Sequence, residues 1–99
     1  MKGIQMYCRT ATLIHNGDTD EIINNLRDQK DKYDAVEGLH SVTYVKISDK
    51  EFLGFAIYES KAHLEAAAEH IQGIMKSFMP LISTPPVFKE GDVPWIYSK

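Results

Sequence analysis

Histidine is the residue type in this sequence best suited to acid–base or metal chemistry, and the chain has four, at positions 15, 40, 63 and 70. His63 and His70 are seven residues apart in a run of helical spacing, which puts them on one helix face about 10 Å apart along its axis. One metal ion held on a helix needs ligands three or four residues apart. The spacing therefore predicts no metal site. It leaves open whether His70 does chemistry or only borders a hydrophobic core.

The other reactive residue types offer no stronger lead. Cys8 is the only cysteine, which excludes an internal disulfide and a thiolate-rich metal site, and we interpret it as a small buried residue of a strand. Acidic residues gather at 18–21 and 89–92, as expected for a helix start and a solvated turn. The sequence contains no nucleophile elbow, Walker A loop or dinucleotide fingerprint. We therefore expect no metal and no cofactor.

The composition is that of a single globular domain spanning residues 1–99, with 43% hydrophobic and 25% charged residues. A net charge of −3 argues against nucleic-acid binding, even though Gly54, Phe55 and Tyr58 fit part of an RNA-recognition signature. No apolar run is long enough to span a membrane, and the N-terminus lacks the apolar block of a signal peptide. We expect a cytoplasmic protein without nucleic-acid or membrane partners.

The N-terminal part of the chain predicts a strand, a polar turn and a helix. Residues 4–14 are rich in β-branched and aromatic side chains, which is typical of a strand. Asp18 and Glu21 form a capping pair for a helix over 19–36, in which apolar residues recur at helical spacing. Gly38 is a suitable residue to stop that helix.

The C-terminal part predicts three strands and a second helix. Segments 39–47 and 51–58 form a hairpin joined by a short polar turn. Ser60 caps a helix over 60–78, and an irregular last strand lies within 87–98.

Two prolines shape these last elements. Pro80 ends or bends the second helix, and Pro94 confines the last strand to a sheet edge or a bulge. The resulting order is βαββαβ. It predicts an α+β, ferredoxin-like protomer with an antiparallel sheet and both helices on one face.

The strands are apolar on both faces. In the third strand, apolar residues of the two faces alternate along the chain: Phe52, Leu53, Phe55, Ala56, Ile57 and Tyr58. A sheet with one solvated face alternates apolar and polar residues instead. Because two helices cover only one face, we predict that the other face packs on the sheet of a second copy in a homodimer.

Several stretches of the chain resemble one protein family. They are the strand closing with "HNGD" before an acidic helix start, "VEGLHSVTYVK", "YESKAHLEA" and "HIQGIMKSFMPLISTPP". Together they are similar to the antibiotic-biosynthesis-monooxygenase-like family of the dimeric α/β-barrel superfamily, over nearly the whole chain. The resemblance implies a sheet-to-sheet dimeric α/β barrel, with a small cavity between sheet and helices in each protomer.

The resemblance also implies an activity and a set of site residues. Relatives include cofactor-independent monooxygenases that act on quinol-like aromatics, whose substrate reacts with O₂ once it is deprotonated. His70 stands at the family histidine of the second helix and is the implied catalytic base. His63 lies seven residues earlier on the same helix face. The implied substrate-binding residues are Thr10, at an inward position of the first strand, Tyr58, where relatives have Trp, His63 and Arg9.

Heme-degrading relatives carry a Trp and a heme-ligating His on the second helix. This chain has alanines at 66–68 and no histidine after His70, so heme is not expected. Three hypotheses remain: a monooxygenase acting on a small aromatic or quinol-type substrate, a non-catalytic barrel that binds a small hydrophobic ligand, and a structural or regulatory dimer. A cavity that touches His70 would favour the first.

Overall fold

An antiparallel sheet of four strands, in the order β2-β3-β1-β4, is the frame of the computed structural model, which describes residues 6–16 and 19–99. The strands are β1 (Met6–Ile14), β2 (Leu39–Ser48), β3 (Glu51–Tyr58) and β4 (Val87–Val93). This arrangement confirms the predicted α+β, ferredoxin-like protomer. The predicted capping role of Asp18, and residues 4–5 of the first predicted strand, lie outside the described residues.

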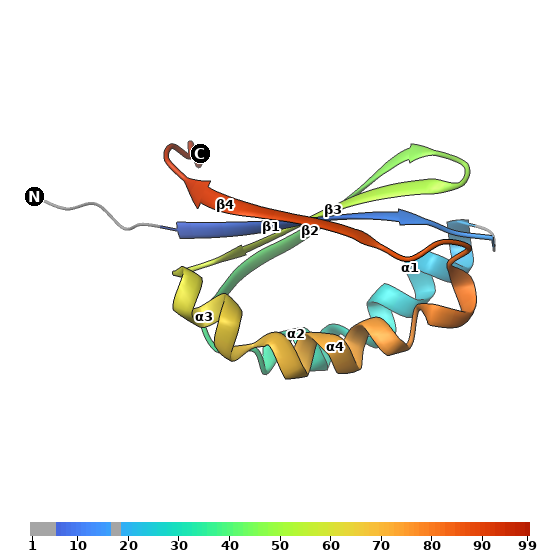
Figure 1. The fold of residues 1–99 in the computed structure, drawn as a ribbon, viewed down its shortest axis with the longest axis horizontal. Coiled ribbons are helices and arrows are strands. Elements are labelled where there is room, and N and C mark those ends of the chain that lie inside the picture. Colours follow the sequence, from blue (N-terminus) through green and yellow to red (C-terminus); the bar gives the residue numbers. More distant parts are fainter. Residues whose placement is uncertain (1–5, 17–18) are drawn as a thin grey trace, which may run out of the picture.

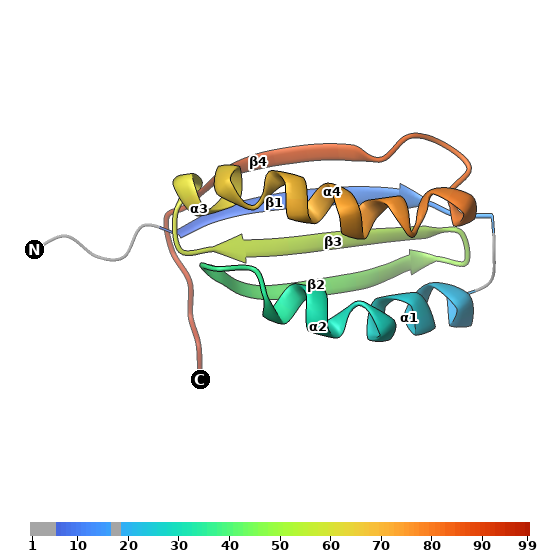
Figure 2. The ribbon, with the colours of Figure 1, turned by 90° about the horizontal axis from the view of Figure 1, so that it is seen from below.

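The helices lie together on one face of the sheet (Figure 1). They are α1 (Thr19–Asp28), α2 (Lys30–Asp34), α3 (Lys61–Ala66) and α4 (Ala68–Lys76), with a short 3-10 turn at Met79–Leu81 after α4. Seen from below, α3 and α4 run along β1 and β3, whereas α1 and α2 lie beside β2 (Figure 2). No helix or strand of the described chain covers the other face, which we call the bare face.

Each of the two predicted helices is interrupted once. The helix expected over 19–36 is α1 followed by α2, and the helix expected over 60–78 is α3 followed by α4. The interruptions are Gln29 and Ala67, where ψ is 0° and −5°. Gln29 is buried, and its side-chain amide donates a hydrogen bond to the Ser77 hydroxyl at 3.0 Å. This tie joins segments that are distant in the chain, so no local pattern displays it.

The predicted end signals are confirmed. Ser60 is the N-cap of α3, where its hydroxyl accepts a hydrogen bond from the backbone N–H of His63 at 3.2 Å. Pro80 lies in the 3-10 turn that follows α4. β4 is an edge strand, and it ends at Val93, directly before Pro94.

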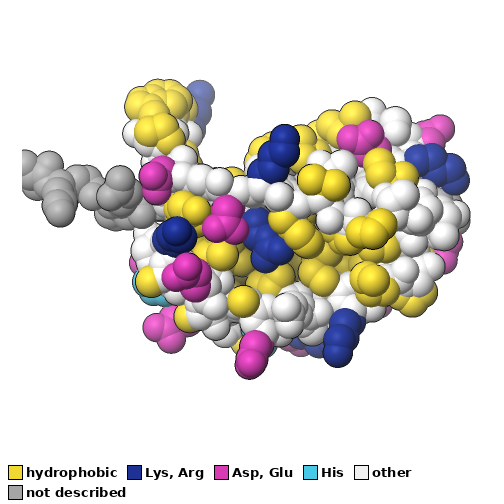
Figure 3. Space-filling model, viewed as in Figure 1, with side chains coloured by type: hydrophobic (Ala, Val, Ile, Leu, Met, Phe, Trp, Pro, Cys, Tyr) yellow, Lys and Arg dark blue, Asp and Glu magenta, His cyan; other side chains and the backbone are white. Residues whose placement is uncertain are grey.

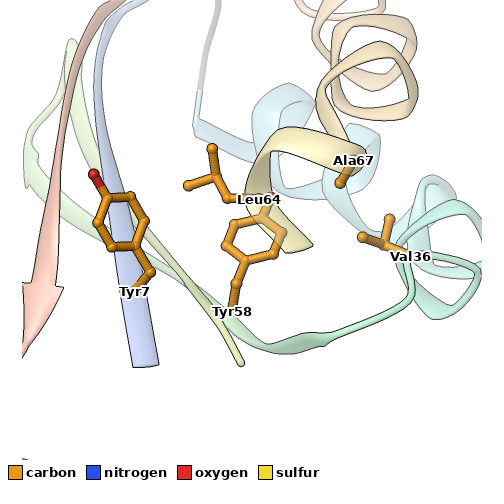
Figure 4. Close-up of a cluster of buried hydrophobic side chains, with 5 residues drawn as sticks. All are labelled: Tyr7, Val36, Tyr58, Leu64 and Ala67. Atoms are coloured by element: carbon orange, nitrogen blue, oxygen red, sulfur yellow. The ribbon is translucent and has the colours of Figure 1, made fainter. Parts of the chain in front are cut away.

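The helix-facing side of the sheet is buried in two separate clusters. The first lies near α3 and contains Tyr7, Val36, Tyr58, Leu64 and Ala67 (Figure 4). The second lies at the other end of the strands and contains Leu13, Ile22, Phe52, Ile74 and Phe78. The alternate residues of β3 fall on the bare face, so the two apolar faces read from the sequence are both present.

Gly38 occupies a position where only glycine fits. Its φ is +80°, a conformation that costs other residues about 1–2 kcal/mol. A side-chain carbon there would also lie 2.1 Å from Cδ2 of the His63 ring. The turn before β2 thus depends on glycine for its backbone conformation and for the close approach of α3.

We expect Gly38→Ala to lower the free energy of unfolding by at least about 1–2 kcal/mol, because the backbone is strained and the His63 ring must move. Gly73→Ala is the matched control, since it lies on α4 with nothing within 4 Å of the added carbon, and it should stabilise by about 0.5–1 kcal/mol. Urea unfolding of both variants checks this. A Gly38→Ala variant as stable as the wild type would contradict the described turn.

Candidate functional site

Between the two clusters, the middle of the helix-facing side carries small residues. On β1 and β3 these are Ala11, Gly54 and Ala56, with Arg9 beside them. They leave a hollow of about 40 Å³, which we call the inner cavity. Its other lining residues include Tyr33, Tyr44, Tyr58, Ile71, Met75 and Phe88. Figure 3 shows hydrophobic side chains and a basic side chain exposed between β4 and the helices.

Arg9 brings a positive charge to the inner cavity. Its guanidinium carbon lies 3.8 Å from the centroid of the Phe88 ring, in a cation–π contact. Its Nε atom is buried and has no hydrogen-bond partner among the described residues. Glu90 faces Arg9 across the β1–β4 pair, but it accepts a hydrogen bond from the Tyr7 hydroxyl at 3.1 Å. Arg9 thus forms no salt bridge with the part of the chain described, and its charge is available to an anionic ligand.

Three tyrosines supply hydroxyl groups to the cavity wall. The hydroxyls of Tyr33, from α2, and Tyr44, from β2, interact with each other, and each shifts the pKa of the other. Burial raises the pKa of Tyr33, Tyr44 and Tyr58 above the ordinary value of 10.0, although the charge of Arg9 lowers the pKa of the last two in part. At neutral pH all three are therefore protonated. They can donate hydrogen bonds to an anion but are poor bases.

The two helix histidines line a different hollow, a depression of about 430 Å³ between α3–α4 and the turn after α2. His70 is exposed, and its Nε2–H donates a hydrogen bond to the backbone carbonyl of Lys32 at 2.9 Å. His63 Nδ1 lies 2.7 Å from the Ser60 hydroxyl oxygen. Neither histidine is among the residues that line the inner cavity. The expected contact of His70 with a cavity beneath the sheet is therefore absent from the described structure.

Thr10 lies on the bare face of the sheet, so its expected inward position is wrong. It pairs with Phe55 and Lys89, and its hydroxyl donates a hydrogen bond to the Lys89 carbonyl at 3.4 Å. Successive strand residues point to opposite faces, so Arg9 turns toward the helices and Thr10 turns away. An error of one residue in register therefore exchanges the two faces.

Sequence reasoning missed the roles of Tyr33 and Tyr44 in the cavity wall. Tyr33 belongs to the helical apolar spacing, which is equally typical of a core residue. The available signal was Gly54, which as a lone strand glycine indicates the close approach of another group. That group is the Tyr44 ring, whose Cε1 lies 2.7 Å from where a side-chain carbon of residue 54 would be.

The remaining reactive groups of the described residues form no further constellation. No three His, Cys, Asp or Glu side chains gather there as a metal ion would require. Cys8 is half-buried on the bare face, and burial raises the pKa of its thiol. None of the described helices is long and apolar enough to cross a bilayer.

The tyrosines of the cavity wall should make stability sensitive to alkaline pH. A group whose pKa is raised by folding stabilises fully below its unfolded pKa of 10.0, and this contribution is lost as pH rises toward the folded value. We expect the free energy of unfolding to fall above about pH 10, and less steeply in Tyr33→Phe. Tyr97→Phe, an exposed control at 68% exposure, should keep the wild-type slope. Urea unfolding across this pH range tests it, and equal slopes in all three proteins would refute it.

The sequence matches no protein-family model and no curated protein. Its fold, by contrast, is similar to solved structures. A protein of unknown function from Nitrosomonas europaea superposes with a TM-score of 0.82 at 15% identity, covering 99% of this chain and 98% of that one. A point mutant of SnoaB, a cofactor-independent oxygenase from Streptomyces nogalater, gives a TM-score of 0.76 at 8% identity, with 98% of this chain and 100% of that chain covered.

A protein from Chloroflexus aurantiacus assigned as an antibiotic biosynthesis monooxygenase gives a TM-score of 0.74 at 15% identity, with 94% of this chain and 97% of that chain covered. These likenesses extend over the whole βαββαβ arrangement. The chain therefore has the fold of the antibiotic-biosynthesis-monooxygenase-like proteins, as its sequence resemblance implied.

Proposed function

We propose that the protein is a cofactor-independent oxygenase that binds the anion of a small, acidic aromatic with its ionised oxygen in the inner cavity. One observation carries this proposal: Arg9 holds a charge there with no carboxylate partner among the described residues, and its buried Nε has no acceptor. An unpaired, partly buried cation is costly to keep, so a site of this kind favours an anionic ligand. The likeness in fold to SnoaB agrees with this chemistry.

The reaction requires little from the protein beyond binding and electrostatics. For a naphthol, the hydroxyl loses its proton and the electron-rich ring then transfers electrons to O₂. The ring carbon opposite the hydroxyl loses its hydrogen and gains one oxygen atom. The second oxygen atom leaves as water, and the ring becomes a quinone. Naphthol and O₂ thus give naphthoquinone and water, without an added reductant.

Arg9 and the cavity tyrosines have distinct roles in this proposal. Arg9 stabilises the developing phenolate, which lowers the pKa of the bound substrate and sends its proton to water. Tyr58, protonated because burial raises its pKa, donates a hydrogen bond to the same oxygen. His70, His63 and Thr10 have no part in it, because the histidines line another hollow and Thr10 lies on the bare face.

A second candidate, a barrel that binds an acidic aromatic without oxidising it, is favoured by a specific observation. The titratable side chains that line the inner cavity are tyrosines with raised pKa and an arginine, none of which accepts a proton at neutral pH. The two candidates share the ligand and the role of Arg9. They differ only in whether O₂ is consumed.

We expect Arg9→Met to weaken binding of 1-naphthol by about tenfold or more, because a hydrogen bond to a charged group is worth about 1.5–3 kcal/mol. Naphthol fluorescence, which differs between phenol and phenolate, measures both affinity and ionisation. Lys76→Met, which removes an exposed charge at the end of α4, should bind as the wild type does. Unchanged binding in Arg9→Met would overturn the proposal. An oxygen electrode separates the candidates: binding without O₂ uptake above the buffer rate leaves the non-catalytic barrel.

We also propose that two copies associate through the bare face. This face carries exposed apolar side chains, among them Val45 at 41% exposure, which pairs with Leu53, and Val87 at 55%, which pairs with Thr12. The chain after β4 rises on the same side (Figure 1), and it carries Trp95 and Tyr97 at 78% and 68% exposure. Apolar surface of this kind is typical of a protein interface. A second sheet would bury it, and the terminal segment would lie against the partner.

We expect Val45→Asp to convert a dimer into a monomer, because burying an unpaired carboxylate between two sheets costs more than the contact gains. Met79→Asp is the matched control, since Met79 is 55% exposed but lies in the 3-10 turn after α4. Sedimentation equilibrium of the three proteins measures the association. A wild type that stays monomeric at high concentration, or a Val45→Asp variant that stays dimeric, would contradict the proposed interface.

A further inference from the structure

A much larger hollow lies on the other side of the inner cavity wall. We call it the edge groove: it has a volume of about 670 Å³ and runs between α1–α2 and β2. Its apolar lining consists of Ile23, Leu26, Val36, Leu39 and Val42. Charged side chains stand at its rim, where Lys30 and Asp34 form a salt bridge of 2.8 Å.

The same two tyrosines border both hollows. Tyr33 and Tyr44 each line the edge groove and the inner cavity. Their hydroxyls interact with each other, so the pair forms part of the wall between the two spaces. Val42 of β2 completes the shared wall.

Neither hollow alone suits an aromatic ligand. The inner cavity, at about 40 Å³, has room for a water molecule or a hydroxyl group but not for a ring. The edge groove has the volume of a small-molecule site, but Arg9 is not among its lining residues. The space that could hold an aromatic ring and the positive charge of Arg9 therefore lie on opposite sides of the tyrosine pair.

We propose that the edge groove is the outer half of the ligand site and that the Tyr33–Tyr44 pair is the gate between the halves. An aromatic hydroxyl compound lies with its apolar body in the groove, and its ionisable oxygen passes the parted tyrosines to reach Arg9. This inference rests on the proposed function, which it deepens by naming the shape of the ligand: one acidic oxygen at the end of an extended apolar body.

The two sides of the gate are held differently. The Tyr44 ring lies against Gly54 on the sheet, where it fills the space of the missing side chain. Tyr33 comes from α2, a five-residue helix without a single buried residue, which follows the interruption at Gln29. Tyr33 is therefore the side chain that moves when the gate opens, and the Tyr44 side chain stays in place. The closed state is stabilised by the interaction between the two hydroxyls.

Removing that interaction should favour the open state. We expect Tyr33→Phe and Tyr44→Phe each to bind 1-naphthol roughly fivefold more tightly, and by equal factors, because each removes the same hydroxyl–hydroxyl interaction from the closed state. Tyr97→Phe, on the exposed terminal segment, serves as the control. Weaker binding in both variants would mean that the hydroxyls hold the ligand, which overturns the gate.

Filling the groove tests the other half of the inference. His40→Trp places a large ring in the groove at an exposed residue of β2, so the fold is retained, and it should weaken naphthol binding about tenfold. Asn24→Trp, at an exposed residue of α1 outside the groove, should have no effect. Backbone amide shifts in NMR spectra with naphthol report the site directly. They should change along α2 and the start of β2.

The outcomes separate this inference from the proposed function. Binding lost in Arg9→Met but unchanged in His40→Trp means that the ligand reaches Arg9 from the β4 side, which overturns the groove and leaves the function standing. Unchanged naphthol binding in Arg9→Met overturns the proposed function. It also overturns the ligand site made of the edge groove and the inner cavity, whatever the affinity of His40→Trp. No binding in either the wild type or Tyr33→Phe overturns both.

Discussion

Two apolar clusters, one at each end of the strands, fix the distance between the helices and the sheet, and the rest of the structure depends on this spacing. Tyr7 and Tyr58 hold one end, and Leu13 and Phe52 hold the other. Between them the strands carry small residues beside Arg9, so the helices bridge a space that they do not fill. Protein interiors are normally filled to crystal-like density, so a gap that is built in by small side chains indicates a functional site.

The electrostatics of that space differ from those of an ordinary core. An interior arginine is usually paired with a carboxylate, because an uncompensated charge destabilises the fold. Here the nearest candidate on the neighbouring strand, Glu90, is engaged by Tyr7. Arg9 instead rests on the Phe88 ring, which stabilises the cation without neutralising it. A fold that retains such a charge gives up stability at the position where we propose that the ligand binds.

The sequence allowed the element order, the edge position of the last strand, the Ser60 cap and the two apolar sheet faces to be predicted, because each depends on local spacing or on one residue. The helix interruptions at Gln29 and Ala67 were not predictable, since alanine favours helices and the Gln29–Ser77 bond joins distant segments. The candidate site was even less predictable from the sequence than these interruptions. Its key distinction, Arg9 inward and Thr10 outward, depends on strand register, which an apolar pattern on both faces does not specify.

The alternation along β1 has a consequence for how this sequence can change over time. Arg9 and Thr10 are neighbours in the chain, yet one lines the inner cavity and the other lies on the bare face. A substitution in β1 alters one of these surfaces. A single inserted or deleted residue would exchange them along the following part of the strand, moving the cation outside and placing interface residues within. We expect length variation among descendants of this chain to collect in its turns and at its ends, and to spare β1.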